Sequence, residues 1–404
     1  MAHWSGSGTH SALAVLVTAS SLLTACGPSR TLKSVPHALV DEAHVEGLPH
    51  VRTWGDGVDE HYLESLAEAV RQRRAYFAAH PEIEPEATAD ILALSGGGEK
   101  GAFGAGLLCG WTEAGDRPQF RIVTGISTGA LIAPLAFLGS EYDDVLRDAY
   151  TSISVDDVAR PRGLLAAITR DGLADTEPLG ELIQKWINDE TLAAIAAEHN
   201  KGRRLLVGTV NLEAERPVIW DLGAIAASGH PDAPALFRQI MLASASIPGA
   251  FEPQYFKVVA GGESYEELHV DGGAVAQVFL WGAGVDLAAI RARVDEGPER
   301  PIRLFVLRNG SFGPDHDPVR PAFIDISGRA ISSLIRTQGI GDTYRLYVRA
   351  QAEGMDFNLA SIPEKFEPAP TKPFDPEYMS ALFQFGYEQA RGGYPWQKSP
   401  PYAE

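Results

Sequence analysis

Cysteine and basic charge are what this sequence has little of. Its 404 residues include two cysteines, Cys26 and Cys109, so a disulfide framework or a cysteine-based metal site is excluded. Lysine and arginine number 34 against 53 acidic residues, which gives a formal net charge of −19. Because phosphate backbones bind to basic surfaces, this charge argues against nucleic acid as a partner. It also argues against simple electrostatic docking on anionic lipid.

An uncharged, mostly apolar run near the N-terminus offers another route to a membrane. The run covers residues 12–23, too short for a spanning helix, which needs roughly 20 apolar residues, but suitable for an export signal. The sequence Leu-Thr-Ala-Cys-Gly at 23–27 resembles a bacterial lipobox, whose cysteine is acylated. This resemblance implies a signal peptide over 1–25 and a lipid anchor at Cys26. Gly27 stands where Asp commonly signals inner-membrane retention, so we expect the outer membrane of the cell envelope.

The rest of the chain is predicted to be a tether followed by one large domain. Residues 26–60 are punctuated by proline, histidine and glycine and lack sustained periodicity, which is typical of a tether. No internal repeat or low-complexity linker interrupts residues 60–391, so residues 61–404 are expected to form a single domain. Cys109 lies in an apolar run and is expected to be a buried, unreactive thiol.

The pattern of apolar residues predicts an α/β fold. A buried strand at 91–94 precedes a helix at 102–113, and a strand at 121–126 precedes a helix at 130–138. This βαβα order implies a mostly parallel central sheet flanked by helices. Further strands are expected at 205–210, 217–220, 267–270 and 302–307, and further helices at 61–80, within 141–200, at 236–243, within 320–352 and at 375–391.

A Gly-x-Ser-x-Gly pattern at Gly125, Ser127 and Gly129 follows the second strand. A serine at a sharp strand-to-helix turn is exposed at the edge of the sheet, and the flanking glycines allow the strained backbone. The following helix directs its N-terminus toward the serine and favours negative charge there. The alternative is a tight turn in which the serine only caps the helix.

A glycine-rich loop follows the first strand in the same way. Its residues are Gly96, Gly97, Gly98, Glu99, Lys100 and Gly101. A dinucleotide-binding loop would need an acidic residue after the next strand, but that strand ends in the serine motif instead. A P-loop would need Lys-Ser or Lys-Thr after the last glycine, but Ala102 and Phe103 follow Gly101. An oxyanion hole formed by the N–H groups of the glycines uses the serine downstream, whereas a plain turn would bind nothing.

The nucleophile needs a base, and the histidines are poor candidates. His199, His230 and His316 lie at a helix end or in polar turns and are expected at the surface. His269 lies two positions before Asp271 on one predicted strand and would be oddly placed as a base. Asp271, followed by Gly272 and Gly273, lies at a strand end, where open parallel sheets place their sites.

Taken together, these motifs resemble the patatin-like phospholipase family. The resemblance covers roughly residues 90–275 and includes two further stretches, 175–179 and 243–248. It implies a three-layer α/β/α fold, with Ser127 as nucleophile, Asp271 as general base and Gly96, Gly97 and Gly98 as the oxyanion hole. It also implies no metal and no cofactor, and a phospholipid or other lipid ester as substrate.

Two other functions stay open at this point. One is a general carboxylesterase with a triad of Ser127, Asp271 and His316. The other is a catalytically silent surface lipoprotein that keeps the fold as a binding module. The sequence does not specify the head group or the acyl position that is cut.

Overall fold

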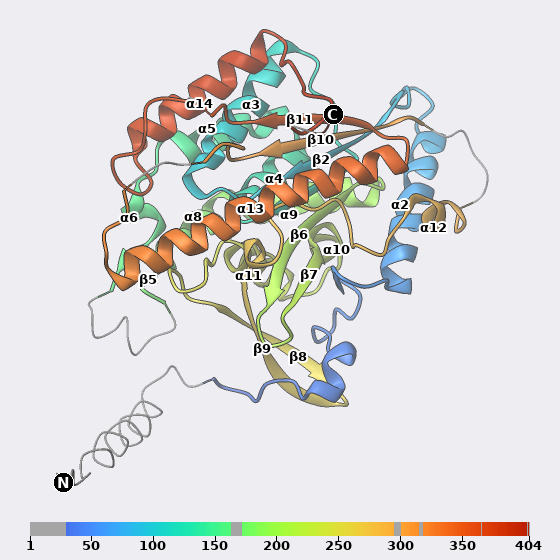
Figure 1. Ribbon diagram of the computed structural model, residues 1–404. Helices are drawn as coiled ribbons and strands as arrows, with labels where there is room; N and C mark the ends of the chain where they lie inside the picture. The colour runs from blue at the N-terminus through green and yellow to red at the C-terminus, as the bar shows by residue number, and fades with distance from the viewer. Residues whose placement is uncertain are drawn as a thin grey trace, which may run out of the picture.

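The fold is built around a mixed sheet in a computed structural model that describes residues 30–162, 172–294, 300–314, 318–364, 366–401 and 403. In these residues nine strands form one sheet, in the order β1-β7-β6-β3-β2-β10-β11, and a β8–β9 hairpin joins it through β9 and β6 (Figure 1). The strands are β1 Arg52–Trp54, β2 Ala89–Leu94, β3 Ile122–Ile126, β6 Arg204–Asn211, β7 Arg216–Asp221, β8 Gln254–Ala260, β9 Glu263–Asp271, β10 Ile302–Arg308 and β11 Asp356–Ser361. A separate pair is formed by β4 Arg160–Pro161 and β5 Ala174–Asp175.

Helices cover both faces of this sheet. The α-helices are α2 Glu60–Ala79, α3 Gly101–Ala114, α4 Thr128–Leu138, α5 Asp143–Thr151, α6 Val155–Val158, α8 Glu177–Trp186, α9 Asp189–Asn200, α10 Leu222–Ala227, α11 Ala233–Ser244, α12 Leu287–Arg291, α13 Phe323–Ala352 and α14 Pro376–Arg391. Short 3-10 turns are η2 His37–Glu42, η3 Gly98–Lys100, η4 Ser140–Tyr142 and η5 Gly272–Ala274. The predicted helix pattern is therefore confirmed, and the described part of the 320–352 stretch forms one long helix.

The centre of the sheet is parallel, as the βαβα order predicts. Strands β6, β3, β2, β10 and β11 pair in parallel, and β7 and β9 pair antiparallel with β6. Every residue of β2 is buried, because helices lie over both faces of a parallel sheet. Alternate residues point to opposite faces: Leu92 packs with α3 and α4, whereas Ile91 packs with α2 and α13. The result is the expected three-layer arrangement.

The segment predicted to be a tether differs from that prediction over its described part. Arg30 binds Glu213 at 2.6 Å, and the Thr31 hydroxyl binds Glu266 of β9. His44 exchanges two backbone hydrogen bonds with Val259 of β8, and β1 pairs with β7. Edge strands leave unpaired backbone groups, and this segment satisfies them, so it packs on the domain instead of linking freely to it.

Some features of the fold leave little trace in local sequence. Strands β8 and β11 were not expected, because neither contains the continuous apolar run that marks a strand buried on both faces. Cys109 is 4% exposed, in agreement with the expected buried thiol, and burial raises its pKa to about 12. In the described residues, no helix has the length and apolarity needed to cross a bilayer. The predicted signal peptide 1–25 and Cys26 lie outside the described residues.

Candidate active site

The serine motif lies at the carboxyl edge of the parallel sheet. Strand β3 ends at Ile126, and Ser127 begins a turn into α4 with φ 56° and ψ −126°. A left-handed φ is unusual for a residue with a side chain, and such strain is concentrated at functional sites. Ser127 is thus held in the sharp turn that the motif predicts.

The two glycines of the motif are needed because the strand and the helix approach each other closely. A Cβ on Gly125 would lie 2.3 Å from the carbonyl oxygen of Gly129. A Cβ on Gly129 would in turn lie 2.5 Å from the carbonyl oxygen of Leu94. Contacts this short do not occur, so no larger residue fits at either position without moving the backbone of the turn.

A second serine fixes the turn from α11. The backbone N–H of Ser127 donates to the Ser244 hydroxyl at 3.0 Å, and that hydroxyl donates to the carbonyl oxygen of Gly208 at 2.7 Å. Ser244 is fully buried and lies in the 243–248 stretch that resembles the family. Its local sequence does not indicate this role, since its partners are 117 and 36 positions away.

Asp271 reaches the same edge by a different route from the one expected. It ends β9, which runs antiparallel to β6 and brings Asp271 opposite Thr209. The β8–β9 hairpin extends beyond the sheet at the bottom of Figure 1, and β9 returns from there. The location predicted for Asp271 is therefore confirmed, although its strand is not one of the parallel ones.

Asp271 lies at the same edge as Ser127, because Asp271 is opposite Thr209 and the preceding Gly208 pairs with Ile126, and Ser127 acts on the carboxyl group by lowering its pKa. Asp271 is 4% exposed, and one carboxylate oxygen accepts the N–H of Gly273 at 2.7 Å. Burial raises the pKa of Asp271 from 3.8 to about 7, against the opposing effects of Ser127 and of the N–H of Gly273, which both lower it. A carboxylate with a pKa near neutrality is a far better proton acceptor than an ordinary aspartate.

The glycine loop offers two free N–H groups beside Ser127. Gly96 is not one of them, because its N–H donates to the carbonyl oxygen of Gln277 at 2.9 Å. This contradicts the expectation that all three glycines are donors. For Gly97 and Gly98, no acceptor is found among the described residues. Gly98 has φ +58°, and a Cβ there would meet no atom within 4 Å, so this residue faces open space.

The other residues of the motifs lie where the secondary-structure elements meet. Gly101 begins α3, and Lys100 ends η3 and is half-buried. The glycines of the three motifs that are buried are Gly101, Gly125, Gly129, Gly272 and Gly273. These positions allow close packing of backbone and do not point a functional group at the site.

Two residues that the sequence did not single out support the loop. Gln277 accepts the N–H of Gly96 and donates its side-chain N–H to the carbonyl oxygen of Gly273 at 2.8 Å. Asn309 donates its backbone N–H to the Ser95 hydroxyl at 2.8 Å and its side-chain N–H to the carbonyl oxygen of Ser95 at 2.9 Å. Gln277 thereby connects the glycine loop to the Asp-Gly-Gly motif.

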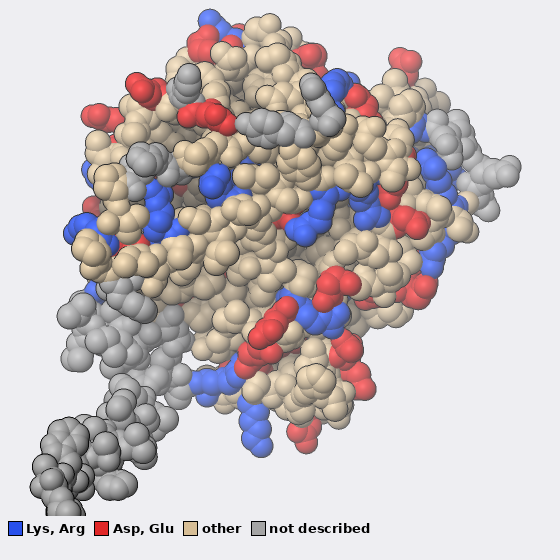
Figure 2. All heavy atoms as spheres, viewed as in Figure 1, with Lys and Arg blue, Asp and Glu red and all other residues tan. Residues whose placement is uncertain are grey.

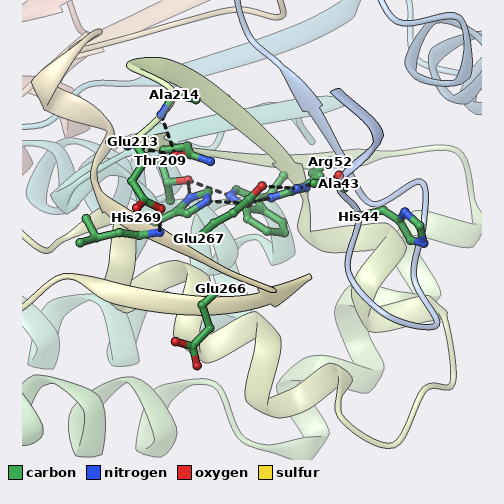
Figure 3. Close-up of polar contacts among 12 residues, drawn as sticks. Ala43, His44, Arg52, Thr209, Glu213, Ala214, Glu266, Glu267 and His269 are labelled. Atoms are coloured by element: carbon green, nitrogen blue, oxygen red, sulfur yellow. Dashed lines mark hydrogen bonds and ion pairs between the residues drawn. The ribbon is translucent and has the colours of Figure 1, made fainter. Parts of the chain in front are cut away.

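The described histidines do not complete a triad. His269 is fully buried, and its ring binds Thr209 at 2.9 Å and Glu267 at 3.2 Å; Glu267 in turn pairs with Arg52 (Figure 3). Burial lowers the pKa of His269, and no contact between it and Ser127 is recorded among the described residues. This network fastens β1, β6 and β9 together beside the catalytic edge.

The surface position expected for His199 is wrong. Its side chain is almost fully buried, and Nδ1 lies 3.7 Å from a carboxylate oxygen of Asp221. Burial lowers the pKa of this imidazole too. The end of α9 looks polar in sequence, but α10 covers it in the fold. His230 is half-buried, and His316 lies outside the described residues.

An apolar cavity opens beside Ser127. It has a volume of about 40 Å³, and Gly98, Ser127 and Thr128 form its polar end. Its other walls include Leu131, Tyr150, Trp186, Ile247, Phe251, Phe374 and Met379. Pockets that hold whole ligands are typically about 300–1,000 Å³, so this cavity must widen to receive a long acyl chain. Within the described residues, no group of three His, Cys, Asp or Glu side chains is placed to hold a metal ion.

Residues 92–283 match the family model for patatin-like phospholipases. The chain contains a patatin-like phospholipase domain. The match begins within β2, spans the glycine loop and the serine turn, and ends beyond Asp271. This match supports lipid acyl hydrolase activity in general.

Two solved structures resemble the chain weakly. No curated protein sequence matches the chain. A crystal structure of VipD from Legionella pneumophila is 13% identical with a TM-score of 0.37, covering 76% of this chain and 67% of that one. Human GIVD cytosolic phospholipase A2 is 10% identical with a TM-score of 0.32, covering 81% of this chain and 53% of that one. The chain thus spans about half the length of the human enzyme.

Proposed function

We propose that this protein hydrolyses a carboxylic ester of a phospholipid or lysophospholipid through a dyad of Ser127 and Asp271. The observation that carries the proposal is that the fold brings these two residues to one edge of the sheet, where Asp271 lies opposite Thr209 and Gly208 pairs with Ile126. Ser127 sits on a strained turn, and two N–H groups that lack a described acceptor lie on the adjacent loop. Nucleophile, base and oxyanion donors are the three parts that acyl transfer needs.

The first half of the reaction forms an acyl-enzyme. Ser127 Oγ attacks the carbonyl carbon of the ester while its proton passes to Asp271. The carbonyl oxygen becomes an oxyanion, which the N–H groups of Gly97 and Gly98 stabilise. The C–O bond to the lipid alcohol then breaks, and the alcohol leaves with the proton from Asp271.

The second half returns the enzyme to its starting state. Water attacks the acyl carbon and gives a proton to Asp271, and the same N–H groups stabilise the second oxyanion. The bond to Ser127 Oγ breaks, Oγ recovers the proton, and a fatty acid leaves. The acyl chain would occupy the apolar cavity beside Ser127, which requires its walls to separate.

The N-terminal segment supports an envelope location. In this proposal residues 1–25 are removed as a signal peptide, and Cys26 carries a lipid anchor in the outer membrane. Substrate and enzyme would then share one bilayer, so no basic docking surface is needed despite the net charge of −19. Metabolic labelling with an alkyne fatty acid tests the anchor, and a Cys26→Ser protein that is still labelled would contradict it.

A fluorophosphonate probe combined with a defined phospholipid panel tests the chemistry. The wild-type protein should be labelled and should release fatty acid, whereas Ser127→Ala should do neither. Asp271→Asn should lose turnover while keeping the fold, because it retains an acceptor for Gly273 N–H. Labelling of Ser127→Ala would refute the nucleophile, and full activity of Asp271→Asn would refute the base.

A further inference from the structure

A second cavity lies at the amino ends of the parallel strands, away from the catalytic edge. Its volume is about 780 Å³, within the range of about 300–1,000 Å³ that is typical of ligand pockets. It opens between α2 and α12, which pack against each other beside β2, β3 and β10 (Figure 1). Arg121 directly precedes β3 and Ser127 directly follows it, so roughly 20 Å separates this cavity from the nucleophile.

The walls of this cavity combine hydrocarbon with positive charge. Apolar side chains include Leu66, Val70, Phe77, Trp281, Leu287 and Ile290. Five arginines, Arg73, Arg74, Arg121, Arg291 and Arg300, also line it, and no Asp or Glu is found among its described lining residues. In Figure 2, basic side chains follow the side of the molecule that α2 forms. In a chain with a net charge of −19, such a concentration of arginine is unexpected.

Not all of these arginines need a ligand. Arg73 pairs with Glu86, which also lies 3.5 Å from Arg300, and Arg74 and Arg291 have other interactions. Arg121 is the exception: among the described residues, its guanidinium has no hydrogen bond and no ion pair. Burial lowers its pKa to about 10, and among the described residues Arg300, Arg74 and Arg204 lower it further by repulsion.

A half-buried arginine beside other arginines is destabilised by partial desolvation and by repulsion between like charges. An anion between Arg121 and Arg300 would remove both penalties, because guanidinium groups bind carboxylate and phosphate by paired hydrogen bonds. The hydrocarbon walls beside them would bury an apolar tail. We propose that this cavity binds an anionic amphiphile with one carboxylate or monophosphate head and a long hydrocarbon tail.

Tryptophan fluorescence can locate the ligand, because one tryptophan is found among the described lining residues of each cavity. Trp281 lines the arginine-lined cavity, and Trp186 lines the cavity beside Ser127. Bromostearate, a quenching fatty acid, is titrated below its critical micelle concentration. We expect saturable quenching that Trp281→Phe removes and Trp186→Phe preserves. The reverse pattern would place the ligand only in the catalytic cavity and overturn the proposal.

The role of the head group is tested by charge removal. Arg121→Gln should weaken bromostearate binding about tenfold or more, the value of a lost hydrogen bond between charged groups. The melting temperature of the variant without ligand should not fall, because the lost guanidinium has no acidic partner among the described residues. If Arg121 had a structural role instead, the melting temperature would fall. Arg147→Gln, at a half-exposed site on α5, is the matched control and should bind normally. Equal binding by Arg121→Gln and wild type would overturn the proposal.

Competition against bromostearate identifies the source of the ligand. Oleate and oleoyl lysophosphatidate are compared in a Ser127→Ala background, which prevents hydrolysis of the second. Competition by oleate alone indicates a free fatty acid, competition by lysophosphatidate alone a lysophospholipid, and competition by both recognition of charge and tail. Oleyl alcohol and inorganic phosphate should compete at least tenfold more weakly, and equal competition by either one would refute an anionic amphiphile.

Discussion

Replacing Asp271 by asparagine should stabilise the protein while it inactivates the enzyme. Burial raises the pKa of Asp271 from 3.8 to about 7. A folded-state pKa above the unfolded one means that the folded protein binds the proton more tightly. Stability is therefore highest below the unfolded pKa, falls as pH rises, and stays at its lower level above the folded pKa. Ionised Asp271 in the buried site costs up to about 4 kcal/mol at pH 8.

The free-energy cost of ionising Asp271 depends on pH, whereas the effect of an ordinary packing change on stability does not. At pH 5.5 the cost is about 2 kcal/mol, because the folded carboxyl is still mostly protonated while the unfolded one is ionised. The neutral amide of Asp271→Asn pays no such cost at any pH. The difference in unfolding free energy between the variant and the wild type should thus widen by about 2 kcal/mol from pH 5.5 to pH 8.

Urea unfolding followed by far-UV circular dichroism at both pH values measures this difference. Ser127→Ala is the matched control, since it changes the neighbour that acts on Asp271 but leaves the carboxyl group in place. A gap between Asp271→Asn and wild type that is constant with pH would show that Asp271 has an ordinary pKa. The argument for its role as a base near neutral pH would then fail.

Three further outcomes follow from the site. The kcat/KM of the wild type should rise with pH and level off above about 7, since the base acts when it is ionised; a flat profile from pH 5.5 to 8 would contradict this. Gly98→Ala should lower kcat about 10²-fold by displacing an oxyanion donor, with KM nearly unchanged in steady-state kinetics. Ser244→Ala should cost about 1–3 kcal/mol of stability in urea unfolding by leaving Ser127 N–H without a partner, and an unchanged midpoint would refute that role.

The local sequence pattern was sufficient to predict the motifs and the three layers of the fold. The apolar run at β2 and the glycines after it predicted both the parallel core and the position of Ser127. The position of Asp271 followed from its place at a strand end. These signals are strong because each depends on residues adjacent in the chain.

Contacts between segments that are far apart in the chain could not be predicted from the sequence. The hydrogen bond from the N–H of Gly96 to Gln277 removes one expected oxyanion donor. No residue near Gly96 in the sequence indicates that its partner lies 181 positions later. His199 was expected at the surface because its neighbours are polar, yet α10 buries it. Both errors arise because periodicity describes one element at a time, whereas hydrogen-bond partners depend on how elements pack.

Residues 30–51, which precede β1 and pack on the domain, limit how far the domain could move from a lipid anchor on Cys26. Four residues lead from Cys26 to Arg30, and they reach at most about 14 Å. Thr31 is bound to Glu266, and β9 covers the five residues from there to Asp271 in about 17 Å. The proposed lipid anchor is therefore joined to the domain by a short linker, which would limit the height and the tilt of the domain over the bilayer. Inserting residues between Cys26 and Arg30 would raise the catalytic edge away from the lipid while leaving every contact within the domain intact.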